Sequence, residues 1–519
     1  MVETATMSSF PEWTEYQKKN GRDPLGMQTS SVGIYQTLLP GIGNVTLRMR
    51  YYGLYAWLCQ IHAKRSGDTN PKTWQRFVRR AEALYALIAT KRGGETGVAG
   101  TEWAGKTLDA SDSGEVDFAA AAEPGSKTHY LKQAWGAYGA AYGSQLYEVG
   151  ILAEAKEHEI PVPSSELGES LASAFADAAG PLAEQFFHAL QRGGITLAEL
   201  DELSPLSPSE ISPSSRECAY YQDMLFAHAG LERPADLARR RTLLLILRLS
   251  ERIKKNPTVS DLRWMLYSNR DEHGVPFVFD SPELREQRMR WWVYQANDLT
   301  HIAYETLLKH VLDLLEGHPA GITLGELIGD IVGNLRSSVD NWPSTWESHL
   351  LQSTTDDPDT EKTLSGSVLR AARPNRICPP EGAWHALQLL AVVHAHARAV
   401  TTEIRSELER FDPTVFHSLL SELGFLETHA NDDFAVTLNK LIEKRIVQRH
   451  LWIALRKLRY QGDYTFLIEC DEGRVRLRAK NGPVFTNPRL SPAITFLNDT
   501  HLIDNNGITE HGRKVLSRA

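Results

Sequence analysis

Helical periodicity runs through most of this 519-residue chain, whereas strand patterns are confined to residues 440–519. Residues 45–64 carry apolar side chains on nearly every face of a helix, which predicts a buried helix with Asn44 as its N-cap. Residues 284–315 and 381–408 predict two further long helices, the first of them rich in aromatic side chains. We therefore expect a mainly α fold with a multi-helical body.

The strand patterns predict a β-hairpin near the C-terminus. Residues 464–469 and 474–478 are rich in β-branched, aromatic or alternating side chains, and the Asp-Glu-Gly sequence at 471–473 is typical of a turn. The ending at 502–513 (LIDNNGITEHGR) looks like the wing and last helix of winged-helix domains. We expect a small α+β, winged-helix-like C-terminal domain, although an Asn-Asn-Gly turn and a helix capped by Thr509 also explain this ending.

Two changes in composition divide the chain into expected domains. Residues 91–128 are rich in Gly, Ser, Asp, Glu and Thr, which predicts a surface insertion with short structure only. Residues 203–215 contain three Ser-Pro pairs without an apolar period, which predicts an extended linker. The expected domains are an N-terminal helical domain, a central helical domain and a basic C-terminal α+β domain, at 1–203, 216–410 and 411–519.

The composition is typical of a soluble globular protein of the cytoplasm. Hydrophobic residues make up 42% of the chain and charged residues 23%. The first twenty residues lack the apolar stretch of a signal peptide, and no window of about 18 apolar residues predicts a membrane span. No Walker loop, Rossmann fingerprint or Gly-x-Ser-x-Gly elbow occurs, so we expect no cofactor. Four cysteines without paired spacing argue against disulfides and a Cys-based zinc site, namely Cys59, Cys218, Cys378 and Cys470.

The charge is distributed unevenly along the chain. The formal net charge is −9, yet residues 440–519 hold 15 Lys and Arg against 8 Asp and Glu. A basic module on an acidic body favours nucleic acid as a partner, with DNA favoured over RNA, and docking of the bases onto the acidic body or plain solvation are the alternatives. Period-2 alternation in residues 474–478 predicts three arginines on one strand face, close to the phosphate spacing. The nucleic-acid-binding residues expected from this pattern are Arg445, Arg449, Arg456, Lys457, Arg459, Arg474, Arg476, Arg478, Lys480, Arg513 and Lys514.

A second hypothesis rests on the pair Arg445 and His450. Their Arg-x4-His spacing resembles the catalytic signature of HEPN ribonucleases. In that family the Arg steadies the phosphate and the His acts as a general acid or base, without a metal. Here Ile446 replaces the polar residue that usually follows the Arg, and a structural basic helix explains the same spacing.

Arg48 and Arg50 stand near the start of the buried helix expected at 45–64. Positive charge there opposes the helix dipole, so each guanidinium requires a partner. A buried carboxylate is the favoured partner, and a set of backbone carbonyls or a bound anion are the alternatives.

Asp298, His301 and Glu305 fall on one face of the helix expected at 284–315. Their spacing is compatible with metal ligation, but a second helix with matching ligands is needed for a di-metal site, and the sequence offers none. We therefore expect structural hydrogen bonds and no metal at these residues.

Two segments together resemble a family of uncharacterised bacterial proteins. The first is Leu39-Pro-Gly-Ile-Gly-Asn-Val-Thr-Leu-Arg-Met-Arg-Tyr-Tyr52 with Trp57, and the second is Arg449-His-Leu-Trp-Ile-Ala-Leu-Arg-Lys-Leu458 with Thr465-Phe466. Proteins with such segments look like those encoded among anti-phage defence genes, beside helicases or nucleases. The resemblance implies a setting and a protein partner such as a helicase, nuclease or ATPase. It implies no reaction.

These observations lead to three functional hypotheses. In the first, the chain is a non-catalytic subunit of a bacterial defence system that binds nucleic acid through its basic C-terminal region and a partner protein through its helical body. In the second, it is a metal-independent ribonuclease that uses Arg445 and His450. In the third, it is an assembly scaffold without nucleic-acid contact.

Overall fold

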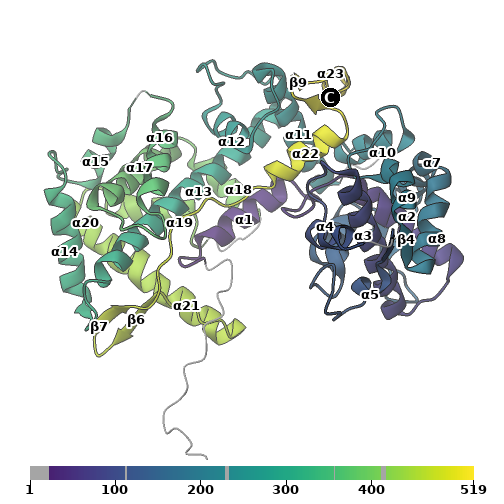
Figure 1. The fold of residues 1–519 in the computed structure, drawn as a ribbon. Coiled ribbons are helices and arrows are strands. Elements are labelled where there is room, and N and C mark those ends of the chain that lie inside the picture. Colours follow the sequence, from purple (N-terminus) through teal and green to yellow (C-terminus); the bar gives the residue numbers. More distant parts are fainter. Residues whose placement is uncertain (1–22, 112–113, 228–232, 356, 411–415, 519) are drawn as a thin grey trace, which may run out of the picture.

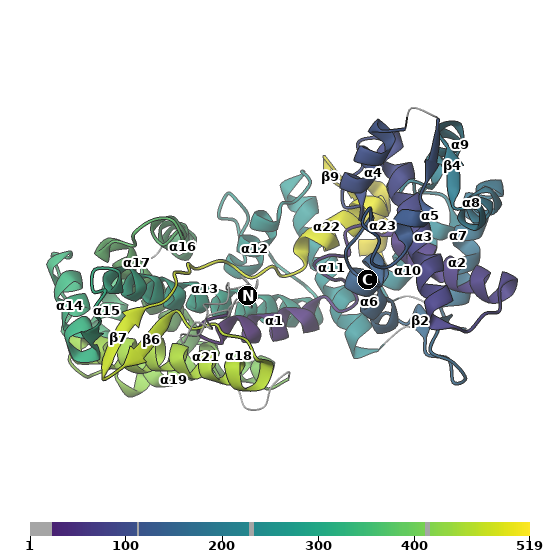
Figure 2. The ribbon, with the colours of Figure 1, turned by 60° about the horizontal axis from the view of Figure 1, so that its bottom comes forward.

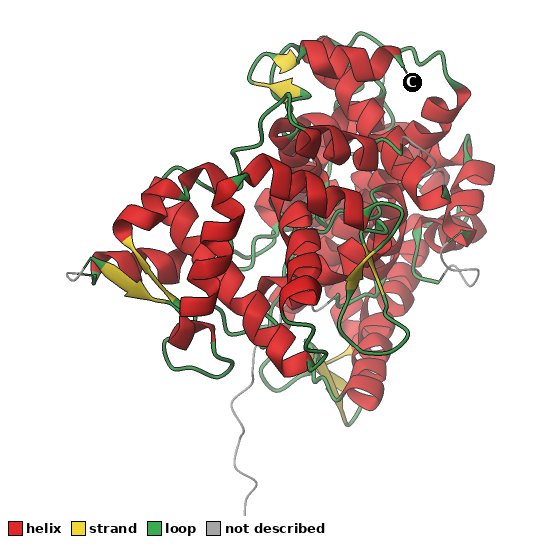
Figure 3. Ribbon diagram, turned by 90° about the vertical axis from the view of Figure 1, so that its right-hand side faces the viewer, coloured by secondary structure: helices red, strands yellow, loops and turns green. Residues whose placement is uncertain are grey.

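The computed structural model describes residues 23–111, 114–227, 233–355, 357–410 and 416–518. The chain is mainly helical with only small sheets, as expected from its periodicity (Figure 3). Among these residues, no helix combines the length and the apolar character that crossing a membrane requires. The cysteines in this part of the chain are all unpaired, three of them buried and Cys470 exposed.

A long central helix, α13 (Pro282–Leu315), organises the fold (Figure 1). It begins two residues before the helix expected at 284–315, because the Ser281 side chain accepts a hydrogen bond from the backbone N–H of Leu284 and Pro282 occupies the first turn. Nearly every residue of its C-terminal two thirds is buried. The helices packed around it are α1 (Met27–Leu38), α11 (Pro234–Ile253), α12 (Val259–Ser268), α16 (Thr360–Ala371) and α17 (Pro380–Arg398).

The N-terminal region packs around α2 (Arg50–Arg65), which is buried against α7 (Gly168–Ala179). Helix α2 begins five residues later than the sequence predicts, because Asn44 does not cap it and instead binds the backbone of the C-terminal residues Asn487 and Arg489. The remaining elements are α3 (Pro71–Arg92), α4 (Thr101–Asp109), β1 (Glu115–Asp117), α5 (Ala119–Ala122), η1 (Tyr138–Tyr142), α6 (Gly143–Glu148), β2 (Leu152–Ala153), β3 (Val162–Pro163), α8 (Pro181–Arg192), β4 (Gly194–Thr196), α9 (Leu197–Glu202), η2 (Ser204–Leu206) and α10 (Arg216–Leu225).

Two segments that were expected at the surface contribute to this region's core. In the predicted insertion at 91–128, Ala104 and Phe118 are fully buried, and β1 pairs antiparallel with β4. Residues 203–215 do not form an extended linker, because they contain the turn η2 and bury Leu206 and Ile211. The Ser-Pro pairs therefore shape a folded connection.

A second large group of helices surrounds the part of α13 that lies away from the N-terminal region. Its helices are α14 (Leu324–Ser337), α15 (Trp346–Ser353), α18 (Thr401–Glu409), α19 (Leu419–Thr428), α20 (Phe434–Lys440), the π-helical turn η3 (Leu441–Val447) and α21 (Gln448–Gln461). A capping box formed by Thr323 and Glu326 begins α14. The single helix expected at 381–408 is instead two helices, α17 and α18, with a break after Arg398.

The C-terminal hairpin is confirmed and carries an additional strand from the central region. Strands β6 (Ile468–Asp471) and β7 (Arg474–Leu477) pair antiparallel, and β5 (Ile322–Thr323) pairs with the other edge of β7, which gives the order β5-β7-β6. The hairpin is therefore built into the body around α13.

Beyond the hairpin, the chain runs back to the other side of the molecule (Figure 2). There α22 (Leu490–Asp499), the strand pair β8 (Ile503–Asp504) and β9 (Gly507–Ile508), and α23 (Glu510–Ser517) pack against α11 and α12. Thr509 caps α23, as its position predicts. The expected C-terminal region at 411–519 thus divides between two separate surfaces, and a winged-helix domain is not confirmed.

Candidate nucleic-acid interface

The last turns of α21 present an exposed face of aromatic, apolar and basic side chains. Helix α21 continues directly from α20 and η3, and its other side is anchored by buried Ile453 and Ala454. It ends at Gly462, whose φ of 68° suits a left-handed cap. The outward residues, which we call the α21 face, are Trp452 (51% exposed), Leu455 (56%), Arg456, Arg459 and Tyr460 (75%).

The two arginines of the α21 face rest on aromatic rings. The guanidinium carbon of Arg456 lies 5.0 Å from the ring centroid of Trp452, and that of Arg459 lies 5.6 Å from the ring of Tyr460. Within the described part of the chain, neither forms an ion pair with a carboxylate. Their charge is therefore free to meet an external anion.

Arg474 and Arg476 of β7, and Arg478 directly after it, are partly neutralised. Val475 is buried between them, as the alternation predicts. Arg474 donates to the carbonyl of Gly321 at 3.0 Å, whereas Arg476 and Arg478 lie 3.7 Å from Asp471 and 3.4 Å from Glu469. Because these ion pairs are exposed and long, they are weak, and a polyanion can compete for both guanidinium groups.

Two of the expected binding residues instead form a buried ion cluster. Arg449 is buried and donates to Glu422 at 2.6 Å, and its guanidinium lies against the ring of Tyr304. Arg445 lies over the Phe425 ring, with its Nε 3.8 Å from Glu422. Burial raises the pKa of Glu422, but the two guanidinium groups outweigh burial and hold it below its ordinary value. Arg449 therefore cannot contact a ligand, because its ion pair with Glu422 is buried between α19 and α21.

His450 is fully buried, and both of its ring nitrogens are used by the backbone. Nε2 accepts hydrogen bonds from the N–H groups of Leu467 (2.8 Å) and Ile468 (3.3 Å), so Nδ1 carries the proton and donates to the carbonyl of Pro24 at 3.2 Å. Burial lowers the pKa of His450 to about 4. This neutral, enclosed ring joins α21 to the hairpin. Because both of its nitrogens are held by backbone groups, it cannot exchange a proton with a substrate.

The remaining expected residues are paired or lie elsewhere. Lys457 donates to the carbonyl of Asp23 at 3.2 Å, and Lys480 lies 2.9 Å from Asp313 and 2.6 Å from Glu316. Arg513 and Lys514 stand on α23, away from the α21 face, and lie 3.9 Å from Glu251 and 3.0 Å from Glu510 respectively. The structure therefore does not bring all the C-terminal bases onto one surface.

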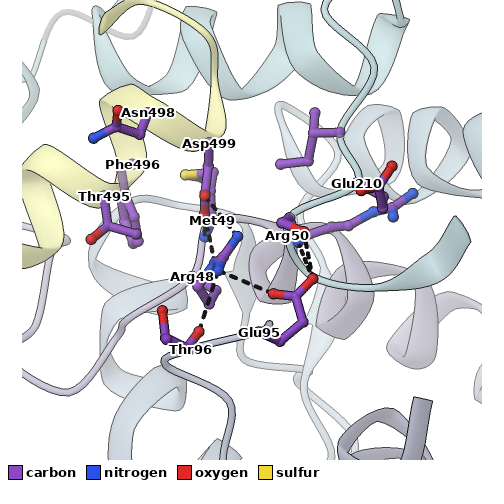
Figure 4. Close-up of polar contacts among 12 residues, drawn as sticks. Arg48, Met49, Arg50, Glu95, Thr96, Glu210, Thr495, Phe496, Asn498 and Asp499 are labelled. Carbon is purple, nitrogen blue, oxygen red and sulfur yellow. Dashed lines mark hydrogen bonds and ion pairs between the residues drawn. The ribbon is translucent and has the colours of Figure 1, made fainter. Parts of the chain in front are cut away.

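Arg48 and Arg50 form buried links between distant parts of the chain. Arg48 binds Asp499 of α22 at 2.9 Å and Glu95 at 3.1 Å, as Figure 4 shows. Arg50 binds Glu217 at 3.1 Å and donates to two backbone carbonyls of residues 203–215. Burial raises the pKa of Asp499 even though Arg48 acts in the opposite direction. These carboxylates occupy both guanidinium groups.

Asp298, His301 and Glu305 meet in the core, where they form hydrogen bonds. Arg263 donates to Asp298 at 3.1 Å, and His301 lies between the two carboxylates at 3.3 and 3.0 Å. Burial opposes protonation of His301, but Glu305 and Asp298 outweigh it and raise its pKa to about 10. Among the described residues, no group of three or more His, Cys, Asp or Glu side chains could hold a metal ion.

Comparisons with protein-family models, with curated proteins and with solved structures found no match for this chain. The site must therefore be judged on its own geometry. That geometry adds three residues that the charge pattern missed, Trp452, Leu455 and Tyr460. A helical projection of α21 offered part of the signal, because Trp452 and Leu455 lie on the same side as Arg456 and Arg459. It does not signal Tyr460, which projects close to buried Ile453 and is exposed because it stands in the last turn of the helix.

Proposed function

We propose that this chain is a non-catalytic subunit that binds nucleic acid through the α21 face and through Arg474, Arg476 and Arg478. The observation that carries the proposal is the pair Arg456 and Arg459, which are exposed, adjacent and without a carboxylate partner among the described residues. On a chain whose net charge is −9, this pair forms a local positive patch. The phosphates of a nucleic acid can pair with these two guanidinium groups, and counterions condensed on the nucleic acid are then released.

The test is the salt dependence of binding by the full chain. Fluorescence anisotropy with labelled DNA, between about 50 and 200 mM salt, gives the slope of log K against log salt. If both arginines contact phosphates, Arg456→Gln with Arg459→Gln should flatten that slope by about 1.4 to 1.8, since each contact contributes about 0.7 on single strands and 0.9 on duplex. An unchanged slope would remove the α21 face from the interface.

A matched control uses two exposed arginines that are already paired. Arg65 lies 3.1 Å from Glu184 on the N-terminal body, and Arg405 lies 3.4 Å from Glu409 on α18. The double variant with Gln at both positions makes the same change in net charge as the test variant. It should leave the slope unaltered, so any effect of net charge alone becomes visible.

The partner protein and the defence setting are supported by the sequence resemblance alone. We propose a helicase, nuclease or ATPase of the same gene cluster as that partner, held by the helical body. Co-expression with neighbouring gene products followed by size-exclusion chromatography tests this, and a chain that elutes alone in every case argues against it. The ribonuclease hypothesis gains no support from His450, because its ring is enclosed and both nitrogens bind backbone groups.

A further inference from the structure

The α21 face combines exposed rings with guanidinium groups that have no carboxylate partner among the described residues. Trp452 and Tyr460 are 51% and 75% exposed, although burial of such rings is normally favourable. Tyr464, at the base of the hairpin, is also exposed, and the guanidinium of Arg478 lies 6.0 Å from its ring. Rings left in water beside cations indicate a surface that is completed by a ligand with both π faces and negative charge.

We infer that the α21 face takes single-stranded nucleic acid, with unstacked bases lying on Trp452 and Tyr460 and phosphates held by Arg456 and Arg459. This inference rests on the proposed function and names its substrate class. In a duplex the bases stack on one another and offer only their edges, so exposed rings gain little from it. In a single strand each base offers a π face, and aromatic stacking contributes to binding of any sequence.

The spacing along the helix suits this mode of binding. At 1.5 Å per residue, Trp452 and Tyr460 stand about 12 Å apart along the axis of α21. Residues 452, 456 and 459 lie nearly above one another on the helix surface, since the intervals are four and three residues. Along the helix axis, one ring therefore lies before the two guanidinium groups and the other ring lies after them. A flexible strand can place bases on the rings and phosphates on the guanidinium groups between them.

The cation–π contacts also hold the rings and cations ready for a ligand. The contacts of Arg456 with Trp452 and of Arg459 with Tyr460 restrict these four side chains, and Trp452 is held further by the ring of His417. A base that stacks on the outer side of either ring leaves these contacts in place. Less conformational entropy is then lost when the strand binds.

The experiment compares an oligothymidylate of about 15 nucleotides with a duplex of equal length, using the full chain. We expect tighter binding of the single strand. Tyr460→Ala should weaken it by roughly 5- to 150-fold without changing the salt slope, because stacking releases no counterions. Tyr460 is mostly exposed, so this variant should keep its fold, and Trp452→Phe gives a second test that retains contact with His417.

Trp135→Ala is the control, because that tryptophan is also exposed but lies on the N-terminal body. Its affinity should equal that of the wild type. Equal or tighter binding of the duplex, together with unchanged binding by Tyr460→Ala and Trp452→Phe, would overturn the inference while leaving the proposed function intact if the arginine variants still flatten the slope. Absence of binding to either nucleic acid would refute the proposed function itself.

Discussion

Replacing His450 should remove one defined contribution to the acid sensitivity of this protein. The ring is fully buried and accepts two backbone hydrogen bonds at Nε2, so the folded state keeps it neutral down to a pKa of about 4. In the unfolded chain its pKa returns to about 6.5. Between these values the unfolded state binds one proton more, so the free energy of unfolding falls as pH falls.

The size of the effect follows from the shift. One proton difference corresponds to about 1.4 kcal/mol per pH unit, so His450 should account for about 3 kcal/mol of lost stability between pH 7 and pH 4. His450→Gln does not titrate. At neutral pH it should be less stable by about 1–3 kcal/mol, because two buried backbone N–H groups lose a well-placed acceptor.

Urea unfolding followed by circular dichroism at pH 7.5, 6.5, 5.5 and 4.5 measures both proteins. The stability difference should shrink steadily as the pH falls below about 6.5. Other buried histidines such as His349, whose pKa burial also lowers to about 4, titrate in both proteins and cancel in the difference. A difference that stays constant with pH would show that His450 reaches solvent, and would return it to consideration as a proton carrier.

Three further predictions concern the core. Arg50→Met should lower the free energy of unfolding by about 3–5 kcal/mol in thermal or urea unfolding, because it leaves the buried carboxylate of Glu217 without its guanidinium partner. A loss below about 1 kcal/mol would contradict this pairing. His301, whose pKa is raised to about 10, contributes stability that is complete below pH 6.5 and lost as pH rises toward 10. Melting temperatures should therefore fall over that range in the wild type and stay flatter in His301→Gln, and parallel curves would argue against a charged His301. A chain ending at Arg410 should be insoluble or unfolded by circular dichroism, because it lacks the Asp499 partner of Arg48 and the β7 partner of β5, and a stable soluble product would refute this.

Features encoded by neighbouring residues were predictable. The helix expected at 284–315 and the turn expected at 471–473 depend on local periodicity, capping and turn preferences, and both formed, as α13 and the β6–β7 hairpin. The late start of α2 was not predictable in this way. Its cause is the contact of Asn44 with residues more than 400 positions away.

The candidate site was predicted in part for the same reason. A count of charges treats Arg449 and Arg456 alike, and at seven residues apart they lie on nearly the same side of α21. Only tertiary packing decides that Arg449, in the first turn, meets Glu422 while Arg456, two turns later, meets water. Likewise, the sequence does not show that the chain turns back after Lys480 and carries Arg513 to another body. Local patterns determine the elements, and long-range packing determines which of their bases remain available.

The location of bound nucleic acid is the most direct test of this account. Ultraviolet crosslinking of the full chain to an oligothymidylate, followed by mass spectrometry of the peptides, reports which side chains touch the bases. The account predicts crosslinks at Trp452 and Tyr460, both exposed on α21, and their loss in the Arg456→Gln/Arg459→Gln variant. Crosslinks on α11 or α23 with none on α21 would contradict it.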